Sequence, residues 1–426
     1  MVFILPWTAG LKTAALRPVE PKDELFDFQI RVDPSWIDPF LFFCRMKIIV
    51  AADSFKDALS ALEVCQAIRR GILQAQPGAE VILFPLADGG EGVAEVVAYH
   101  LKCTQISLQV ADPLGRPVRA TYCYSAGGRV AFVEMAQASG LQLLGLEERD
   151  PMKTTTYGTG QLIKDAIFRG AEKILLGIGG SATNDAGMGM ATALGWRFLG
   201  ANGQSIIPKG ENLGKVVAIE GGLLDGLTRL NDPPVIEVLC DVANPLFGPT
   251  GAARTYARQK GADEESIDKL EAGMRHFSEV LDRHFGKNFA KVPGAGAAGG
   301  MGAGALAFLQ ARLRPGIEAM LELTSFDQQL AGVDLVITGE GKLDAQTMSG
   351  KLIQGICKRA GRQGVPVIAM CGTLEATMPQ IEAIGLTAAF SIIQKPQTLK
   401  EAILETRQGL QSLAYNVLKT IGLGKT

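Results

Sequence analysis

The segment MKIIVAADSFK, residues 46–56, decides the fold class of this chain. Its KIIVAA part is a short continuous apolar run, which is typical of a parallel strand covered on both faces. Ser60 and Glu63 then form the pattern of a capping box before an amphipathic helix, and Pro77 with Gly78 ends that helix. A second apolar run, VILFPLA, follows. The order of strand, turn, helix and strand predicts an α/β fold.

The same order returns in the last third of the chain. Three predicted strands there end in glycine or polar turns: DLVITGEGKLD (334–344), VPVIAMCG (365–372) and AAFSII (388–393). In the middle of the chain, VRATYCYSAGGRVAFVEMA (118–136) has the pattern of an antiparallel hairpin. We therefore predict a Rossmann-like parallel-sheet domain built from residues 46–110 and 290–426, with a second α/β domain inserted at 111–289.

Composition excludes several classes of protein. Of the 426 residues, 47% are hydrophobic, so the chain can bury a large core, and its net charge of −2 gives no attraction for nucleic acid or an anionic membrane. No run approaches the roughly 18 apolar residues of a membrane span. The seven cysteines include no Cys-x-x-Cys pair, so we expect neither a disulfide framework nor a zinc ribbon, and a cytoplasmic location. Residues 1–45 lack periodicity and are predicted to be a poorly ordered extension.

Polar, glycine-containing loops follow predicted strands at five places. They are DSFK (53–56), ADGGEG (87–92), GIGGSATND (177–185), CDVANP (240–245) and TGEGKLD (338–344). In open α/β sheets ligands bind at this carboxyl edge, and glycines there let backbone N–H groups approach an anion. In the third loop Ser181, Thr183 and Asn184 add donors, and Asp185 adds a carboxylate. A helix cap alone would need only one of these side chains.

Two familiar nucleotide motifs do not fit this chain. The pattern Gly177-x-Gly179-x-x-Ala182 lacks an acidic residue roughly 20 positions later, as a dinucleotide site requires. The pattern that begins at Gly294 follows a segment that ends in Pro293, and this proline makes the segment a poor central strand. A Walker A loop is absent from the sequence as well. The glycine patterns alone therefore do not support a nicotinamide dehydrogenase.

The charged residues favour phosphoryl transfer. The sequence has three histidines and no GxSxG motif, which argues against acyl transfer by a triad. Phosphoryl transfer needs positioning, charge neutralisation and a base for the attacking hydroxyl. The cations near the loops are Lys56, Lys342 and Lys351, and the carboxylates are Asp53, Asp88, Glu91, Asp185, Asp241, Glu340 and Asp344. A non-catalytic ligand sensor would not need so many candidate metal ligands.

Six segments together resemble the bacterial type 1 glycerate kinase family (glycerate 2-kinases). They are AADSFKDALSA, PLADGGEG, GIGGSATNDAGMGMATALG, CDVANPLFGPTGAA, PGAGAAGGMGAGALAF and DLVITGEGKLDAQTMSGK, in that order over 46–426. The resemblance implies a Rossmann-like domain with an inserted α/β domain. It also implies an enzyme that transfers the γ-phosphate of ATP to glycerate, most often at the 2-hydroxyl. The alternatives are a kinase that makes 3-phosphoglycerate or acts on another small hydroxy acid.

Motif chemistry gives each candidate residue a hypothetical role. The substrate-binding candidates are Ser54, Gly89, Gly90, Gly179, Gly180, Ser181 and Asn184. The catalytic candidates are Asp185 or Asp241 as the base, Asp88 as an equal alternative, and Lys56 as a cation for the glycerate carboxylate. The ATP phosphates are assigned to Gly299, Gly300, Gly302 and Lys342, and Mg²⁺ to Glu340 or Asp344. We expect these loops to line one cleft, with glycerate and ATP as the ligands and a homodimer left open as the assembly.

Overall fold

The computed structural model describes residues 46–88, 92–222, 234–344 and 352–423. The extension predicted at 1–45 lies outside the described residues. So do Gly89, Gly90, Glu91 and Lys351, which the sequence suggested as site residues.

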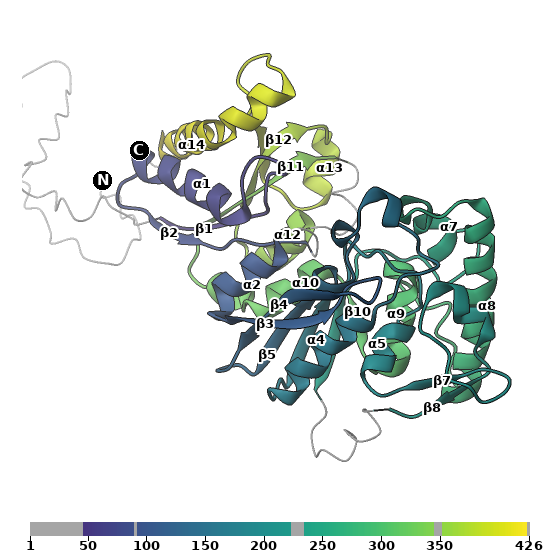
Figure 1. The fold of residues 1–426 in the computed structure, drawn as a ribbon. Coiled ribbons are helices and arrows are strands. Elements are labelled where there is room, and N and C mark those ends of the chain that lie inside the picture. The colour runs from purple at the N-terminus through teal and green to yellow at the C-terminus, as the bar shows by residue number, and fades with distance from the viewer. Residues whose placement is uncertain (1–45, 89–91, 223–233, 345–351, 424–426) are drawn as a thin grey trace, which may run out of the picture. The chain divides into compact units, whose positions relative to one another are not determined.

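A five-stranded parallel sheet combines both ends of the chain (Figure 1). Its strands are β1 (Lys47–Ala52), β2 (Glu80–Leu83), β11 (Leu335–Leu343), β12 (Val367–Leu374) and β13 (Ala388–Ser391). Their order is β13-β12-β11-β1-β2, and all neighbours are parallel, with Ile48 opposite Leu335. The predicted α/β class, with a parallel sheet drawn from both chain ends, is confirmed.

Alternate residues of β1 pack into two hydrophobic cores, as expected of a strand covered on both faces. Ile49 packs on one side, toward helices α10 and α12, and Ile48 packs on the other, toward α1 and α14. The helices associated with this sheet are α1 (Ala61–Ala75), α10 (Gly316–Leu323), α11 (Phe326–Gln329), α12 (Leu352–Arg362), α13 (Met378–Ala383) and α14 (Leu399–Leu423). The predicted capping box of Ser60 and Glu63 is present at the start of α1.

A six-stranded mixed sheet occupies the middle of the chain. Its strands are β3 (Thr104–Ala111), β4 (Pro117–Ser125), β5 (Val130–Glu134), β6 (Lys173–Gly177), β9 (Val235–Leu239) and β10 (Arg312–Arg314). The order is β10-β9-β6-β5-β4-β3, parallel from β10 to β5 and antiparallel through the β3-β4-β5 meander. Because β3 and β10 pair here, the chain changes sheet before residue 104 and after residue 314. The sequence had placed these changes near 111 and 290.

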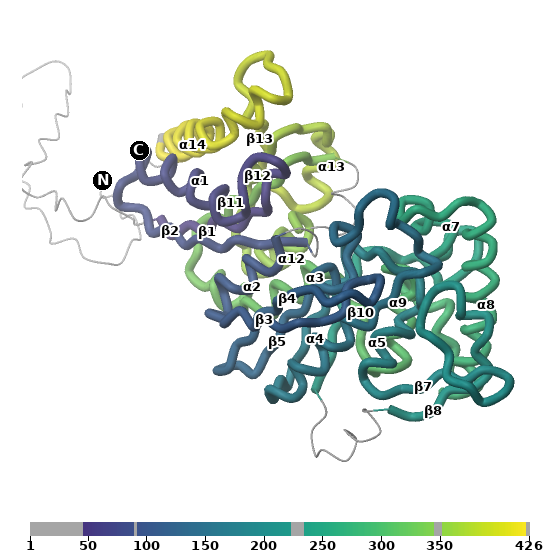
Figure 2. Tube along the Cα trace, in the orientation of Figure 1, coloured from purple at the N-terminus to yellow at the C-terminus, as the bar shows by residue number. Residues whose placement is uncertain are grey.

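Helices cover both faces of this second sheet. Phe132 and Leu175 pack against α2 and α10 on one face, while Val133 and Ile174 belong to the large core formed with α4 and α9. In Figure 2 the trace of α9 lies beside that of α5. The remaining helices are α2 (Val93–Leu101), α3 (Ala136–Ser139), α4 (Tyr157–Phe168), α5 (Met188–Ala193), α7 (Ala252–Tyr256), α8 (Glu264–Phe285) and α9 (Ala297–Phe308). Short 3-10 helices η2 (Leu141–Leu143), η3 (Leu146–Glu148), η4 (Gly210–Lys215) and η5 (Arg258–Lys260) and a β7 (Arg197–Leu199) to β8 (Ala218–Glu220) pair complete the fold.

Membrane insertion finds no support in the described helices. None of them is both long enough and apolar enough to cross a bilayer.

Candidate functional site

The carboxyl edge of the five-stranded sheet holds a cavity where the strand order reverses. The chain runs outward from β1 to β2 in one direction and from β11 to β13 in the other, so β1 and β11 form the switch point at which open α/β sheets bind ligands. The N–H of Asp53 donates to the carbonyl oxygen of Gly339 at 2.9 Å and joins the two strand ends. A cavity of about 550 Å³ opens here, which we call the switch-point cavity. Its polar lining consists of Asp53, Ser54, Lys56, Asp88, Glu340, Lys342, Thr373 and Thr406.

Three carboxylates, those of Asp53, Asp88 and Glu340, line this cavity. The pKa of Asp53 is raised to about 7, mainly because its carboxyl group is removed from water and also because Asp88 and Glu340 carry like charges. The N–H and Oγ of Ser54 donate to Asp53 Oδ1 at 2.6 and 3.3 Å, which partly offsets this rise in pKa. A cation bound among these groups would offset the cost of burying the ionised Asp53. It would also reduce the repulsion between the carboxylates.

Two lysines line the same cavity. Lys56 is exposed on the tight turn after β1. Lys342 lies near the end of β11, and its Nζ pairs with Asp344 at 3.3 Å and with Glu375 at 2.9 Å, which raises the pKa of Lys342. Asp344 is not among the residues that line the cavity. Its role as a metal ligand therefore stays a prediction without support from this geometry.

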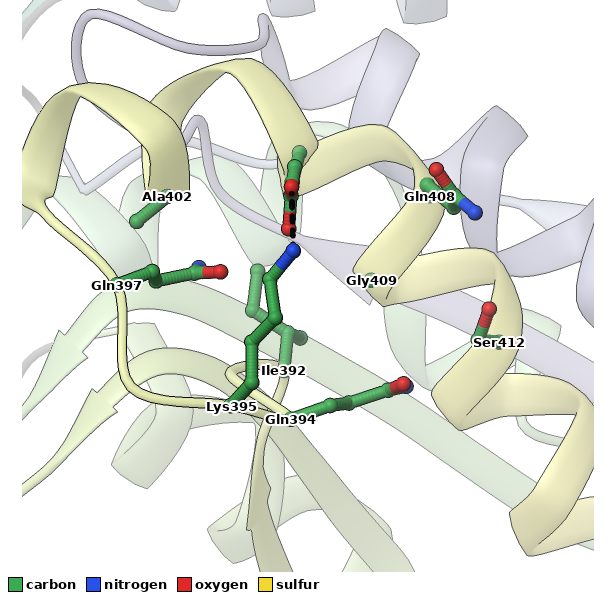
Figure 3. A pocket seen from close by; sticks show the side chains of 9 residues that line it. Ile392, Gln394, Lys395, Gln397, Ala402, Gln408, Gly409 and Ser412 are labelled. Carbon is green, nitrogen blue, oxygen red and sulfur yellow. Dashed lines mark hydrogen bonds and ion pairs between the residues drawn. The ribbon is translucent and has the colours of Figure 1, made fainter.

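Apolar side chains line another part of the switch-point cavity, which we call its apolar wall. It is formed by Ile392, Ile393, Leu399, Ala402 and Ile403 from the end of β13 and the start of α14. Ile392 and Ala402 also line a smaller pocket of about 190 Å³ (Figure 3), where Lys395 Nζ and Glu405 Oε1 are 2.9 Å apart. Two lysines, and carboxylates that could hold a cation, next to an apolar wall suit a ligand that has a phosphate chain and an aromatic base.

A second cavity, of about 610 Å³, lies at the carboxyl edge of the six-stranded sheet. We call it the loop cavity because the glycine loop after β6 forms part of its wall. Its polar or backbone lining includes Asp88, Gly179, Gly180, Ser181, Asp241, Tyr256, Gln259 and Lys260. Asp88 lines both cavities. The predicted single cleft is thus two adjoining cavities, with Asp88 common to both.

Lys260 is a site residue that sequence reasoning missed. It is 2% exposed, and its Nζ donates to Ser181 Oγ and to the carbonyl oxygen of Thr183, both at 2.7 Å. Burial lowers the pKa of Lys260 to about 7, against an opposing effect of nearby Asp185. The sequence signal for it is the helical spacing of Ala253, Ala257 and Lys260, which places Lys260 on the same face as two small apolar residues.

The structure separates the two aspartates that the sequence offered first as the base. Asp241 is exposed and lines the loop cavity, where its Oδ1 accepts the N–H of Gly316 at the start of α10 at 2.9 Å. Asp185 is 1% exposed and lines neither cavity. Its Oδ2 accepts from Thr156 N, Thr156 Oγ1 and Gly189 N at 2.8, 2.9 and 3.1 Å. This carboxylate organises the loop from within, and a substrate hydroxyl would not reach it.

Asn184 also lies inside the loop rather than at its surface. Its side chain is fully buried, and within the described part of the chain its amide atoms have no hydrogen-bond partner. It does not line the loop cavity, unlike Gly179, Gly180 and Ser181. The substrate contact predicted for Asn184 does not fit this position.

The glycines assigned to ATP phosphates are closely packed against other backbone segments. Gly299, Gly300 and Gly302 are buried at the start of α9 and line neither cavity. A Cβ atom on Gly299 would lie 2.0 Å from the carbonyl oxygen of Thr183, and one on Gly302 would lie 2.1 Å from that of Gly294. These positions require glycine because two backbones approach each other closely. Such glycines look the same in sequence as a phosphate-binding loop.

Mg²⁺ fits the chemistry of the switch-point cavity, although no ready-made cage is present. Among the described residues, no three His, Cys, Asp or Glu side chains cluster as a metal site. Mg²⁺ is usually held by one or two carboxylates together with substrate phosphates and water. Asp53 and Glu340 offer such carboxylates, and the raised pKa of Asp53 indicates a place where positive charge is favoured.

Comparison with known proteins agrees with this geometry. A model described as the glycerate kinase family matches residues 48–422. The chain belongs to the glycerate kinase family. A glycerate kinase of Bacillus cereus is 44% identical over 372 residues, which are 87% of this chain and 97% of that protein. The glycerate 2-kinase of Escherichia coli is 42% identical over 379 residues, which are 89% of this chain and 99% of that protein.

The fold of this glycerate kinase family member also has a solved counterpart. A crystal structure described provisionally as glycerate kinase 2 from Salmonella typhimurium superposes with a TM-score of 0.81 at 42% identity, over 89% of this chain and 99% of that one. The family resemblance drawn from six sequence segments is confirmed, and with it the class of enzyme, a kinase.

Proposed function

We propose that this chain transfers the γ-phosphoryl group of ATP to the 2-hydroxyl of (R)-glycerate. The observation that carries the proposal is that Asp88 lines both the switch-point cavity and the loop cavity. A donor in one and an acceptor in the other would meet at this carboxylate. A glycerate 2-kinase at 42% identity favours the 2-hydroxyl over the 3-hydroxyl.

ATP is assigned to the switch-point cavity. The adenine ring would lie against the apolar wall at Ile392, Leu399 and Ile403, and the phosphates would extend toward Lys56 and Lys342. This placement replaces the glycines of α9 as the phosphate site. A volume of about 550 Å³ is in the range of small-molecule and cofactor sites.

Mg²⁺, when bound with ATP, would neutralise charge on the phosphate oxygens. Asp53 and Glu340 would hold it, since both line the cavity at the β1–β11 switch point. This chain would supply these carboxylates for the cation, and Lys56 would place a positive charge beside the phosphates.

Glycerate is assigned to the loop cavity. Its carboxylate would lie against the backbone of Gly179 and Gly180 and the hydroxyl of Ser181, as the sequence suggested for this loop. Its 2-hydroxyl would then point toward Asp88. The hydroxyl oxygen forms a bond to the γ-phosphorus, the bond from that phosphorus to the β–γ bridging oxygen breaks, and the hydroxyl proton passes to the Asp88 carboxylate.

Asp241 would orient the acceptor rather than take its proton. Its Oδ1 is already engaged by the N–H of Gly316, which fixes the carboxylate at the edge of the loop cavity. A cytoplasmic location and a homodimer remain predictions that nothing in this geometry requires.

A coupled assay tests the proposed reaction. The protein is incubated with ATP, Mg²⁺ and (R)-glycerate, and the product is offered to enolase with or without phosphoglycerate mutase. We expect enolase alone to consume it, because enolase takes 2-phosphoglycerate directly. A need for mutase would show phosphorylation at the 3-hydroxyl. ADP release with a different hydroxy acid and none with glycerate would overturn the substrate assignment.

A further inference from the structure

The charged residues that line the loop cavity bear on which substrates it accepts. Two of the described residues that line it, Asp88 and Asp241, are acidic, and Lys260 is the single basic one among them. A substrate carboxylate held by the glycine loop would be attracted by the ammonium group of Lys260, which contacts Ser181 of that loop.

The ammonium group of Lys260 is placed to meet such an anion. Two of its three N–H donors point to Ser181 Oγ and Thr183 O, each at 2.7 Å. Within the described ranges no other protein group takes the third donor. Lys260 and Ser181 both line the cavity, so a carboxylate held by the loop would lie beside Nζ.

The backbone around Lys260 fixes the side chain in advance of binding. Lys260 ends the 3-10 helix η5, and Gly261 follows it with a φ of 99°. A Cβ atom on Gly261 would lie 2.0 Å from the carbonyl oxygen of Arg149, so the chain turns in close contact with that segment. A charge held in place before binding costs little ordering entropy when the ligand arrives.

We propose that Lys260 binds the carboxylate of the hydroxy-acid substrate and so makes the enzyme select an acid over its uncharged analogue. This inference rests on the proposed function, and it assigns to Lys260 the part that the sequence had given to Lys56. Lys56 is left to the phosphates of ATP.

The environment of Lys260 adds a dependence on pH. Burial lowers its pKa to about 7, while Asp185 partly restores the charged form, and Asp88, Asp241 and Tyr256 line the same cavity. A bound carboxylate favours the protonated amine, so only the protonated free enzyme binds glycerate well. The protonated fraction falls about tenfold per pH unit above the pKa, and KM for glycerate should rise correspondingly above pH 7.

The variant Lys260→Met tests the assignment against a neutral substrate analogue. We expect KM for glycerate to rise about 10- to 100-fold, since a hydrogen bond to a charged group is lost. KM for ATP and the inhibition constant of glyceramide, the uncharged amide of glycerate, should change less than about threefold. Lys269→Met is the matched control, because Lys269 lies exposed on α8 with its Nζ paired to Glu265.

Two outcomes for this variant would overturn the assignment. One is an unchanged KM for glycerate. The other is a parallel loss of affinity for glycerate and glyceramide, which would mean that Lys260 only supports the loop.

If Lys260→Met does not fold, the pH dependence of the wild-type enzyme tests the assignment. KM for glycerate rising above pH 7, with a flat glyceramide constant, supports the role, and a flat KM from pH 6.5 to 9 refutes it. Should the wild type not phosphorylate glycerate, calorimetry of glycerate and glyceramide binding to both proteins tests Lys260 separately.

Discussion

The backbone N–H of Asp53 donates a 2.9 Å hydrogen bond to the carbonyl oxygen of Gly339, from the end of β1 to β11. This bond joins two segments that are far apart in the sequence and brings Asp53 close to Glu340, whose charge raises the Asp53 pKa. The switch point of the sheet thus creates the acidic cavity directly. The repulsion between these like charges would favour the binding of a cation.

Asp53→Asn should stabilise the metal-free protein at high pH. The folded-state pKa of Asp53 is about 7, above its ordinary value of 3.8, so the ionised form destabilises the fold above pH 7 and this penalty disappears as pH falls from 7 toward 4. We expect the variant to have the higher Tm at pH 8.5 and a shrinking difference at pH 5, measured by calorimetry with EDTA. Equal Tm values at pH 8.5 would contradict the raised pKa.

Asp88→Asn should abolish most turnover without preventing binding. Loss of a general base usually costs about 10²-fold or more in kcat. Because Asp88 lines both cavities, we expect that loss in kcat with KM for ATP and glycerate changed by less than about fivefold. Asp268→Asn, on the exposed side of α8, is the control and should match wild type. A kcat within a few-fold of wild type would exclude Asp88 and leave Asp241 as the base.

Asp185→Asn should affect stability more than catalysis. The Asp185 Oδ2 accepts three hydrogen bonds from Thr156 and Gly189, and Oδ1 accepts one from Gly187. An amide would turn one NH₂ group toward backbone donors, which should lower the free energy of unfolding by about 1 to 3 kcal/mol. Urea unfolding measures this loss, and kcat of the folded fraction should stay within about threefold of wild type. A stable variant with kcat reduced 100-fold would restore Asp185 as the base.

Sequence patterns predicted the sheet and its ligand edge well, because burial on both faces and strand-end glycines leave local signatures. The apolar run at 47–52 and the polar loops after β1, β6 and β11 lie where the patterns placed them. Which polar residue faces a cavity is decided by packing with distant segments. Asp185 turns inward toward Thr156, whereas Asp88, in a less conspicuous loop, lines both cavities.

Lys260 and the glycines of α9 also show what a local sequence pattern cannot predict. Lys260 belongs to no glycine-rich motif, and its contacts with Ser181, 79 positions away, and with Thr183 place it in the site. The glycines of α9 have the composition of a phosphate loop, yet their neighbours are the backbones of Thr183 and Gly294. A local pattern records that glycine is needed and does not record what approaches it.

A matched pair of glycine substitutions separates packing from nucleotide binding. In Gly302→Ala the new Cβ would lie 2.1 Å from the carbonyl oxygen of Gly294, whereas in Gly361→Ala, on α12, it would meet nothing within 4 Å. Neither glycine has a positive φ, so strain does not distinguish them. We expect Gly302→Ala to lose about 1 to 3 kcal/mol of unfolding free energy from overpacking and Gly361→Ala to gain up to about 1 kcal/mol from helix propensity. Both should keep KM for ATP near wild type, since the nucleotide lies in the switch-point cavity. A selective rise in KM for ATP in a stably folded Gly302→Ala would return the phosphates to α9.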